Sequence, residues 1–113
     1  MNNLEKYIYE YLKERDWDWQ LGYPSHLAKS ISIESAELLE LFQWEDIKID
    51  KLKEDKELYQ KTKDELADVL IYCMEMALSL GVSSEEIIRE KLEKAKYKYP
   101  IGIGTNKKYL EIK

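Results

Sequence analysis

Residues 31–44 read ISIESAELLELFQW and residues 64–76 read DELADVLIYCMEM, and these two stretches decide the fold. Each stretch includes a pair of carboxylates three residues apart, set among mostly apolar residues that favour helix. The first pair is Glu34 and Glu37, and the second pair is Glu65 and Asp68. Charged groups in apolar helices need a physical reason, because burying a charge without a partner is costly.

The face of each carboxylate follows from its number, since a helical residue advances roughly 100° around the axis. Glu34 falls inside the apolar arc of the first stretch, Glu37 on its shoulder at about 60°, and Glu40 outside it at about 120°. On the second stretch, Glu65 and Asp68 border the apolar arc in the same way. If these two helices pack antiparallel in a bundle, their edges place four carboxylates around one pocket.

Four carboxylates around one pocket need compensation. Two charges 4 Å apart repel by about 1 kcal/mol in water and by several times that in a partly buried site. The cluster must therefore take up protons, pair with Lys or Arg, or bind a metal ion. Oxygen ligands favour Mg²⁺ or Mn²⁺, whereas the single Cys and single His of the chain disfavour zinc. No Glu-x-x-His pair of a di-iron bundle surrounds these positions.

The rest of the chain also has helical patterns. Apolar spacing and end signals predict four helices, over residues 3–16, from Ser25 to Trp44, from a start within 54–62 to Leu80, and from Ser83 to a stop before Pro100. Residues 45–56 are predicted to be a connector with room for a short helical turn, and residues 101–113 an irregular tail. No strand pattern is found, so the expected fold is an all-α four-helix bundle.

The ends of the later helices carry specific signals. Gly81 suits the left-handed residue that ends a helix, and Ser83 with Glu86 matches a capping box. The last helix is expected to turn its apolar residues inward; these are Ile87, Ile88, Leu92 and Ala95.

Size and charge limit the class of protein. The 113 residues are expected to form one domain, near the size at which small proteins gain stability by forming oligomers. The net charge of −5 gives no general attraction for nucleic acid or an anionic membrane. No signal peptide and no apolar run of roughly 20 residues is found, so we expect a soluble cytoplasmic protein. The lone Cys73 rules out an internal disulfide.

With these residues in view, the chain resembles the MazG-like all-α nucleotide pyrophosphohydrolases, and most closely their dCTP-pyrophosphatase-like branch. The signature of that superfamily is E-x-x-E followed, after a variable spacer, by E-x-x-D. Here the two motifs are Glu34-Ser-Ala-Glu37 and Glu65-Leu-Ala-Asp68, separated by 27 residues. Similar residues extend over nearly the whole chain, including Arg15-Asp16-Trp17, the Lys98-Tyr99-Pro100 stop and Lys108-Tyr109.

The resemblance implies a function and a set of site residues. It implies hydrolysis of nucleoside triphosphates to the monophosphate and pyrophosphate with Mg²⁺, as house-cleaning of the nucleotide pool, by a homodimer or homotetramer. It implies that the four motif carboxylates bind the metal, and that Glu34 or Glu37 positions or deprotonates the attacking water. Phosphoryl transfer requires positioning and charge neutralisation, which a carboxylate-held metal supplies.

Further residues are candidates for substrate binding. The cationic candidates for the polyphosphate are Lys29, Lys91, Lys94 and Lys98, of which Lys91 and Lys98 match family positions. The aromatic residues that match positions near the nucleotide in that branch are Trp17, Trp44 and Tyr72, and a base stacks favourably on such side chains. Core packing or an oligomer interface is the alternative role for these aromatic residues.

The chain departs from the branch at His26, where an Asn is frequent, and at position 95. Ala95 stands where the branch usually has an Asn that faces the substrate, and alanine makes no polar contact. This departure favours a second possible function, a catalytically silent helical interaction module on the same scaffold. Within the superfamily, hydrolysis of phosphoribosyl-ATP is another alternative, although residues 31–44 resemble that branch less.

Overall fold

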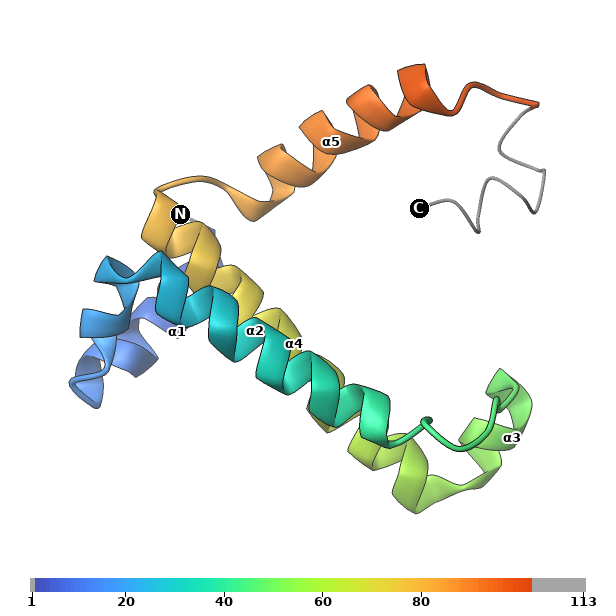
Figure 1. The fold of residues 1–113 in the computed structure, drawn as a ribbon. Coiled ribbons are helices and arrows are strands. Elements are labelled where there is room, and N and C mark those ends of the chain that lie inside the picture. The colour runs from blue at the N-terminus through green and yellow to red at the C-terminus, as the bar shows by residue number, and fades with distance from the viewer. Residues whose placement is uncertain (1, 103–113) are drawn as a thin grey trace. The chain divides into compact units, whose positions relative to one another are not determined.

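The computed structural model describes residues 2–102 of the chain, and its ribbon is drawn in Figure 1. These residues contain five α-helices, one 3-10 helix and no strand. The elements are α1 (Asn3–Glu14), η1 (Asp18–Gly22), α2 (Pro24–Glu40), α3 (Ile49–Glu54), α4 (Lys56–Leu80) and α5 (Ser84–Lys98). The prediction of an all-α fold is confirmed. Completion of the bundle by a second subunit stays a prediction.

The chain divides into two units, residues 1–81 and residues 82–113, and each is described by itself. In the first unit, α4 is the central helix and contacts all the other elements. Helix α2 lies antiparallel beside α4, while α1 and η1 lie near the carboxyl end of α4 and α3 near its amino end (Figure 1). The two helices that carry the acidic pairs are therefore direct neighbours, as the sequence predicts.

The buried core of the first unit is small. Leu27 on α2 is fully buried at 0% exposure. The other buried apolar residues of the described chain are Ile8, Leu12, Leu52 and Ala77. One hydrogen bond, from Ser79 Oγ to the Leu21 carbonyl oxygen at 2.6 Å, fixes η1 against α4. Because η1 leads directly into α2, this bond also helps to set the start of α2.

The helix ends follow the local sequence signals. The N–H of Leu58 donates to Asp55 Oδ1 at 3.1 Å, which caps α4. Gly81 ends α4 with a φ of 69°, the left-handed conformation predicted for it. At the start of α5, the N–H of Glu86 donates to Ser83 Oγ at 3.2 Å, which is the first of the two bonds of the predicted capping box.

Helix α2 ends at Glu40, so the predicted end at Trp44 is wrong. After Glu40, each backbone N–H donates to the carbonyl oxygen three residues back instead of four. The N–H of Leu41 donates to Leu38 at 3.2 Å and the N–H of Phe42 donates to Leu39 at 2.9 Å. This tightening is typical of a helix end. Trp44 therefore lies in the connector, with 88% of its surface exposed.

The second unit contains one described helix, α5, which buries none of its residues. Within this unit, Ile88 and Leu92 are each 57% exposed. That the apolar face of α5 points inward stays a prediction, because it concerns packing against residues outside this unit. No other described element belongs to this unit, so nothing within it covers that face. The predicted irregular tail, with Lys108 and Tyr109, lies outside the described residues from residue 103 onward.

None of the described helices is, on its own, both long and apolar enough to span a membrane. Only α4 and α5 counted together, as a broken pair, reach the required length and composition.

Candidate active site

The two acidic motifs meet between α2 and α4. Glu34 and Glu37 lie one turn apart on α2, and Glu65 lies on the neighbouring part of α4. One carboxylate oxygen from each of these three residues lies within 4.8 Å of the other two. Asp68, one turn further along α4, is not a member of this group, but its charge acts on Glu34 and Glu65. Three of the four predicted metal ligands are thus gathered, with the fourth nearby.

The environment of the cluster disfavours negative charge. Burial raises the pKa of the Glu34 carboxyl, and the neighbouring Glu37, Asp68 and Glu65 raise it further. Burial, followed by the charge of Glu37, also raises the pKa of Glu65. Glu34 Oε2 and Glu65 Oε2 are buried and have no hydrogen-bond partner within residues 2–102. These two oxygens are free to accept a bond or to coordinate a cation.

The donor set fits a divalent cation. Of the three forms of compensation, pairing with Lys or Arg is not observed, since the ion pairs of the described residues all lie elsewhere. Protons or a cation remain. Mg²⁺ and Mn²⁺ take carboxylate oxygens as ligands, and Mg²⁺ usually completes its shell with water and substrate phosphates. Two unpartnered oxygens on facing helices match this requirement.

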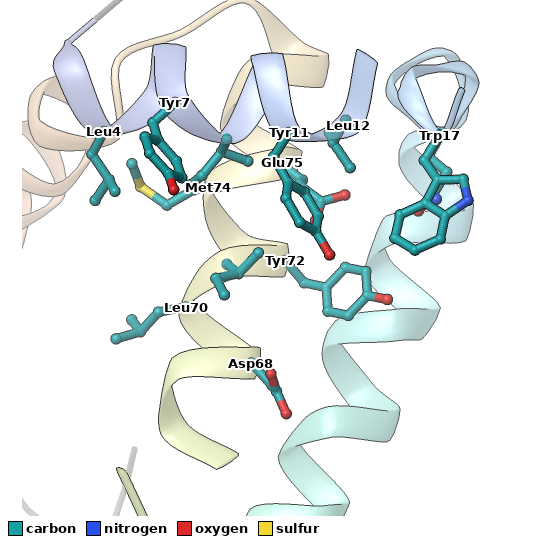
Figure 2. A pocket seen from close by; sticks show the side chains of 13 residues that line it. Leu4, Tyr7, Tyr11, Leu12, Trp17, Asp68, Leu70, Tyr72, Met74 and Glu75 are labelled. Carbon is teal, nitrogen blue, oxygen red and sulfur yellow. The ribbon is translucent and has the colours of Figure 1, made fainter. Parts of the chain in front are cut away.

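A pocket of about 520 Å³ adjoins the cluster at Asp68, within the first unit (Figure 2). Its lining comes from α1, from the chain around η1 and from α4. The residues of the lining are Leu4, Tyr7, Ile8, Tyr11, Leu12, Trp17, Gln20, Asp68, Leu70, Ile71, Tyr72, Met74 and Glu75. The lining is mostly apolar and aromatic, and the volume lies in the range of pockets that hold small ligands.

Trp17 reaches the pocket because of the turn that ends α1. The N–H of Trp17 donates to the Leu12 carbonyl at 2.9 Å and that of Asp16 donates to the Lys13 carbonyl at 3.1 Å, the pattern of a Schellman motif. Asp16 takes the left-handed position with a φ of 57°. The turn brings the Trp17 ring to 6.0 Å from the Tyr11 ring, edge to face. The predicted residues Trp17, Tyr72 and Asp68 therefore line one pocket.

Tyr72 lines the pocket and also lies close enough to the carboxylate cluster to be affected by its charge. Burial raises the pKa of its phenol, and the charges of Glu75, Glu34 and Asp68 raise it further. The phenol thus lies within electrostatic reach of carboxylates from both places. In Figure 2 its ring lies on the Asp68 side of the pocket.

The sequence reasoning missed Glu75. This residue lines the pocket and is 4% exposed, and its Oε1 atom is buried without a hydrogen-bond partner in the described part of the chain. Burial raises the pKa of its carboxyl to about 7. The sequence spacing could have indicated Glu75, because residues 68, 72 and 75 lie on one face of a helix. Counting on from Asp68 would have placed Glu75 on the edge of α4 that carries the acidic pair.

The remaining predicted residues lie outside this pocket. Trp44 does not line it and stands exposed in the connector. Lys29 is exposed on α2. Lys91 and Lys98 lie on α5, in the second unit. Their roles toward the substrate stay predictions.

Fold and site together define an all-α protein with a carboxylate cluster beside an aromatic pocket. The model of the MazG-like family matches residues 29–112, about three quarters of the chain, and the chain belongs to this family. The resemblance to MazG-like nucleotide pyrophosphohydrolases read from the sequence is confirmed.

Individual relatives agree with this assignment. The chain is 28% identical over 115 residues to dCTP pyrophosphatase 1 of Mus musculus and 28% identical over 123 residues to that of Homo sapiens. In both cases 99% of this chain and 67% of the relative are covered. Among solved structures, it is similar to a pyrophosphatase from Archaeoglobus fulgidus with a TM-score of 0.74 and 35% identity. That match covers 86% of this chain and 89% of the other.

Proposed function

We propose that the protein is a Mg²⁺-dependent pyrophosphohydrolase that converts nucleoside triphosphates, deoxynucleotides among them, to the monophosphate and pyrophosphate. Its role is house-cleaning of the nucleotide pool. One observation carries this proposal: Glu34, Glu37 and Glu65 are gathered within 4.8 Å, with two unpartnered buried oxygens, beside an aromatic pocket. The names of the relatives support the same chemistry.

Glu34, Glu37, Glu65 and Asp68 are the residues proposed to hold the cation. Bound there, Mg²⁺ would neutralise the negative charge of the phosphate oxygens. One carboxylate of the first motif, Glu34 or Glu37, holds the attacking water and takes its proton. The water oxygen forms a bond to phosphorus as the bond across the α–β anhydride breaks, and pyrophosphate leaves.

The nucleoside is proposed to occupy the aromatic pocket. Trp17 and Tyr72 offer ring faces and edges to a base, and stacking of this kind contributes roughly 1–3 kcal/mol per base. Lys29, Lys91 and Lys98 are proposed to pair with the polyphosphate. Trp44 lies outside this pocket, and its contact with the base stays a prediction from the sequence. A homodimer or homotetramer is the proposed assembly, and the cytoplasm is the proposed location.

Pyrophosphate release tests this proposal. The protein is incubated with Mg²⁺ and a panel of canonical and modified nucleotides, and the variants Glu37→Ala and Asp68→Ala are measured beside it. We expect turnover of at least one nucleoside triphosphate and its loss in both variants. Turnover of phosphoribosyl-ATP alone would support that rival substrate. No turnover by a folded protein would support a silent interaction module.

A further inference from the structure

Glu75 is the buried polar residue that the proposed chemistry leaves unexplained. Its side chain is 4% exposed, and Oε1 has no hydrogen-bond partner among the described residues. A buried acceptor without a donor lowers stability, so such a group calls for a role beyond packing. Glu75 lines the pocket, and Figure 2 shows its carboxyl group on the side where Tyr11 and Leu12 lie.

The position of Glu75 along α4 places it at the far end of the proposed substrate. Asp68 and Glu75 are seven residues apart on the same helix face, which is a rise of about 10 Å. Phosphates bind at the end of the pocket that carries Asp68 and the carboxylate cluster. In a nucleotide the sugar separates the phosphates from the base, so the base is the part that reaches Glu75.

We propose that Glu75 determines base specificity, its carboxylate accepting a hydrogen bond from an exocyclic amino group of the base. This inference rests on the proposed function for the identity of the substrate. An ionised carboxylate has acceptor atoms only, so it pairs with an amino group and repels the carbonyl oxygen of an oxo base. In nucleic-acid recognition, Glu makes the same contact with the amino group of cytosine.

The chemistry of the pocket makes this contact selective. The walls near Glu75 are the side chains of Tyr11 and Leu12, which supply much apolar surface (Figure 2). A pocket that places one polar group against apolar walls discriminates strongly against a ligand that leaves this group unpaired. We therefore expect amino bases to be preferred over their oxo counterparts.

The matched pair dCTP and dUTP tests the assignment, because the bases differ in the amino or oxo group at one ring carbon and in the proton on the neighbouring nitrogen. With Mg²⁺ at pH 8, the wild-type protein is expected to show a kcat/KM for dCTP about 10- to 100-fold above that for dUTP, the effect of one hydrogen bond to a charged group. Glu75→Gln adds an amide N–H₂ that donates to the oxo group, so the ratio should fall at least about tenfold.

Two further variants complete the design. Glu75→Met keeps a side chain of similar length without polar atoms and should also remove the preference. Glu10→Gln, an exposed position on α1 outside the pocket, should keep the wild-type ratio. Circular dichroism confirms that each variant is folded. Turnover with the same ratio in all proteins, or an equal rate for dCTP and dUTP in the wild type, overturns the role of Glu75 and leaves the proposed function standing.

A binding measurement separates the two proposals. If no nucleotide is hydrolysed, the proposed function fails, and calorimetry with dCMP and dUMP decides the role of Glu75. Preference for dCMP that is lost in Glu75→Gln supports the assignment without hydrolysis. Equal binding, or no binding of either nucleotide, overturns it.

Discussion

Replacing Glu75 with Gln should stabilise the unliganded protein, and increasingly so as the pH rises. Burial raises the pKa of the Glu75 carboxyl to about 7 from an ordinary value of 4.5. The folded state therefore holds this proton more tightly than the unfolded state does. Protonated Glu75 therefore contributes to the unfolding free energy in a way that ionised Glu75 does not. This contribution is fully present below about pH 4.5, decreases as the pH rises to about 7, and is absent above that pH.

The magnitude follows from the shift. A difference of about 2.5 pKa units corresponds to up to about 3 kcal/mol of unfolding free energy at pH 8. At pH 5.5, which is above the isoelectric point of about 5.0, the penalty is about 1 kcal/mol. Gln does not titrate. The stability gained by Glu75→Gln should therefore be larger at pH 8 than at pH 5.5 by about 2 kcal/mol.

Urea denaturation followed by circular dichroism measures this difference, with a chelator present so that divalent ions do not contribute. Glu34 and Glu65 titrate in both proteins, and their contribution cancels in the comparison. Glu10→Gln, at an exposed position on α1, serves as the control for the Glu-to-Gln substitution itself. If Glu75→Gln differs from wild type by the same amount at both pH values, the burial argument for Glu75 is refuted.

Three other substitutions test separate parts of the structure. Glu65→Gln should raise the melting temperature in chelator, because it removes one of the mutually repelling carboxylates. Mg²⁺ at 100 times its Kd should stabilise the wild type by about 3 kcal/mol, and Glu65→Gln should abolish this stabilisation. Leu27→Ala should lower the unfolding free energy by about 2–5 kcal/mol in urea, since the Leu27 side chain is fully buried. Gly81→Ala should lower it by about 1 kcal/mol, because φ is 69° there; an unchanged midpoint would contradict the left-handed turn.

The helices and the meeting of the acidic pairs could be predicted from local signals. The spacing of apolar residues predicted helix α4, and the glycine at position 81 predicted where it ends. The computed helix faces ranked Glu34 as more buried than Glu37, and the structure shows the same order. These features depend on neighbours within a few turns, which is why the sequence alone was sufficient.

Other features depend on tertiary packing and were not predicted. The residues after Glu40 are compatible with helix, so only the folded backbone shows that the bonding switches and places Trp44 in the connector. The residues that cover Ile88 and Leu92 on α5 likewise depend on tertiary packing, which the spacing of apolar residues does not specify. Glu75 is one carboxylate among many in the sequence, and its significance follows from its burial without a partner.

The central claim is that the carboxylates of α2 and α4 hold a divalent cation. Electron paramagnetic resonance of Mn²⁺ titrated into the protein measures this directly, with Glu34→Gln and Glu65→Gln beside the control Glu10→Gln. The account predicts that the wild type and the control bind Mn²⁺ and that both site variants lose at least about tenfold in affinity. Equal Mn²⁺ binding by all four proteins would contradict it.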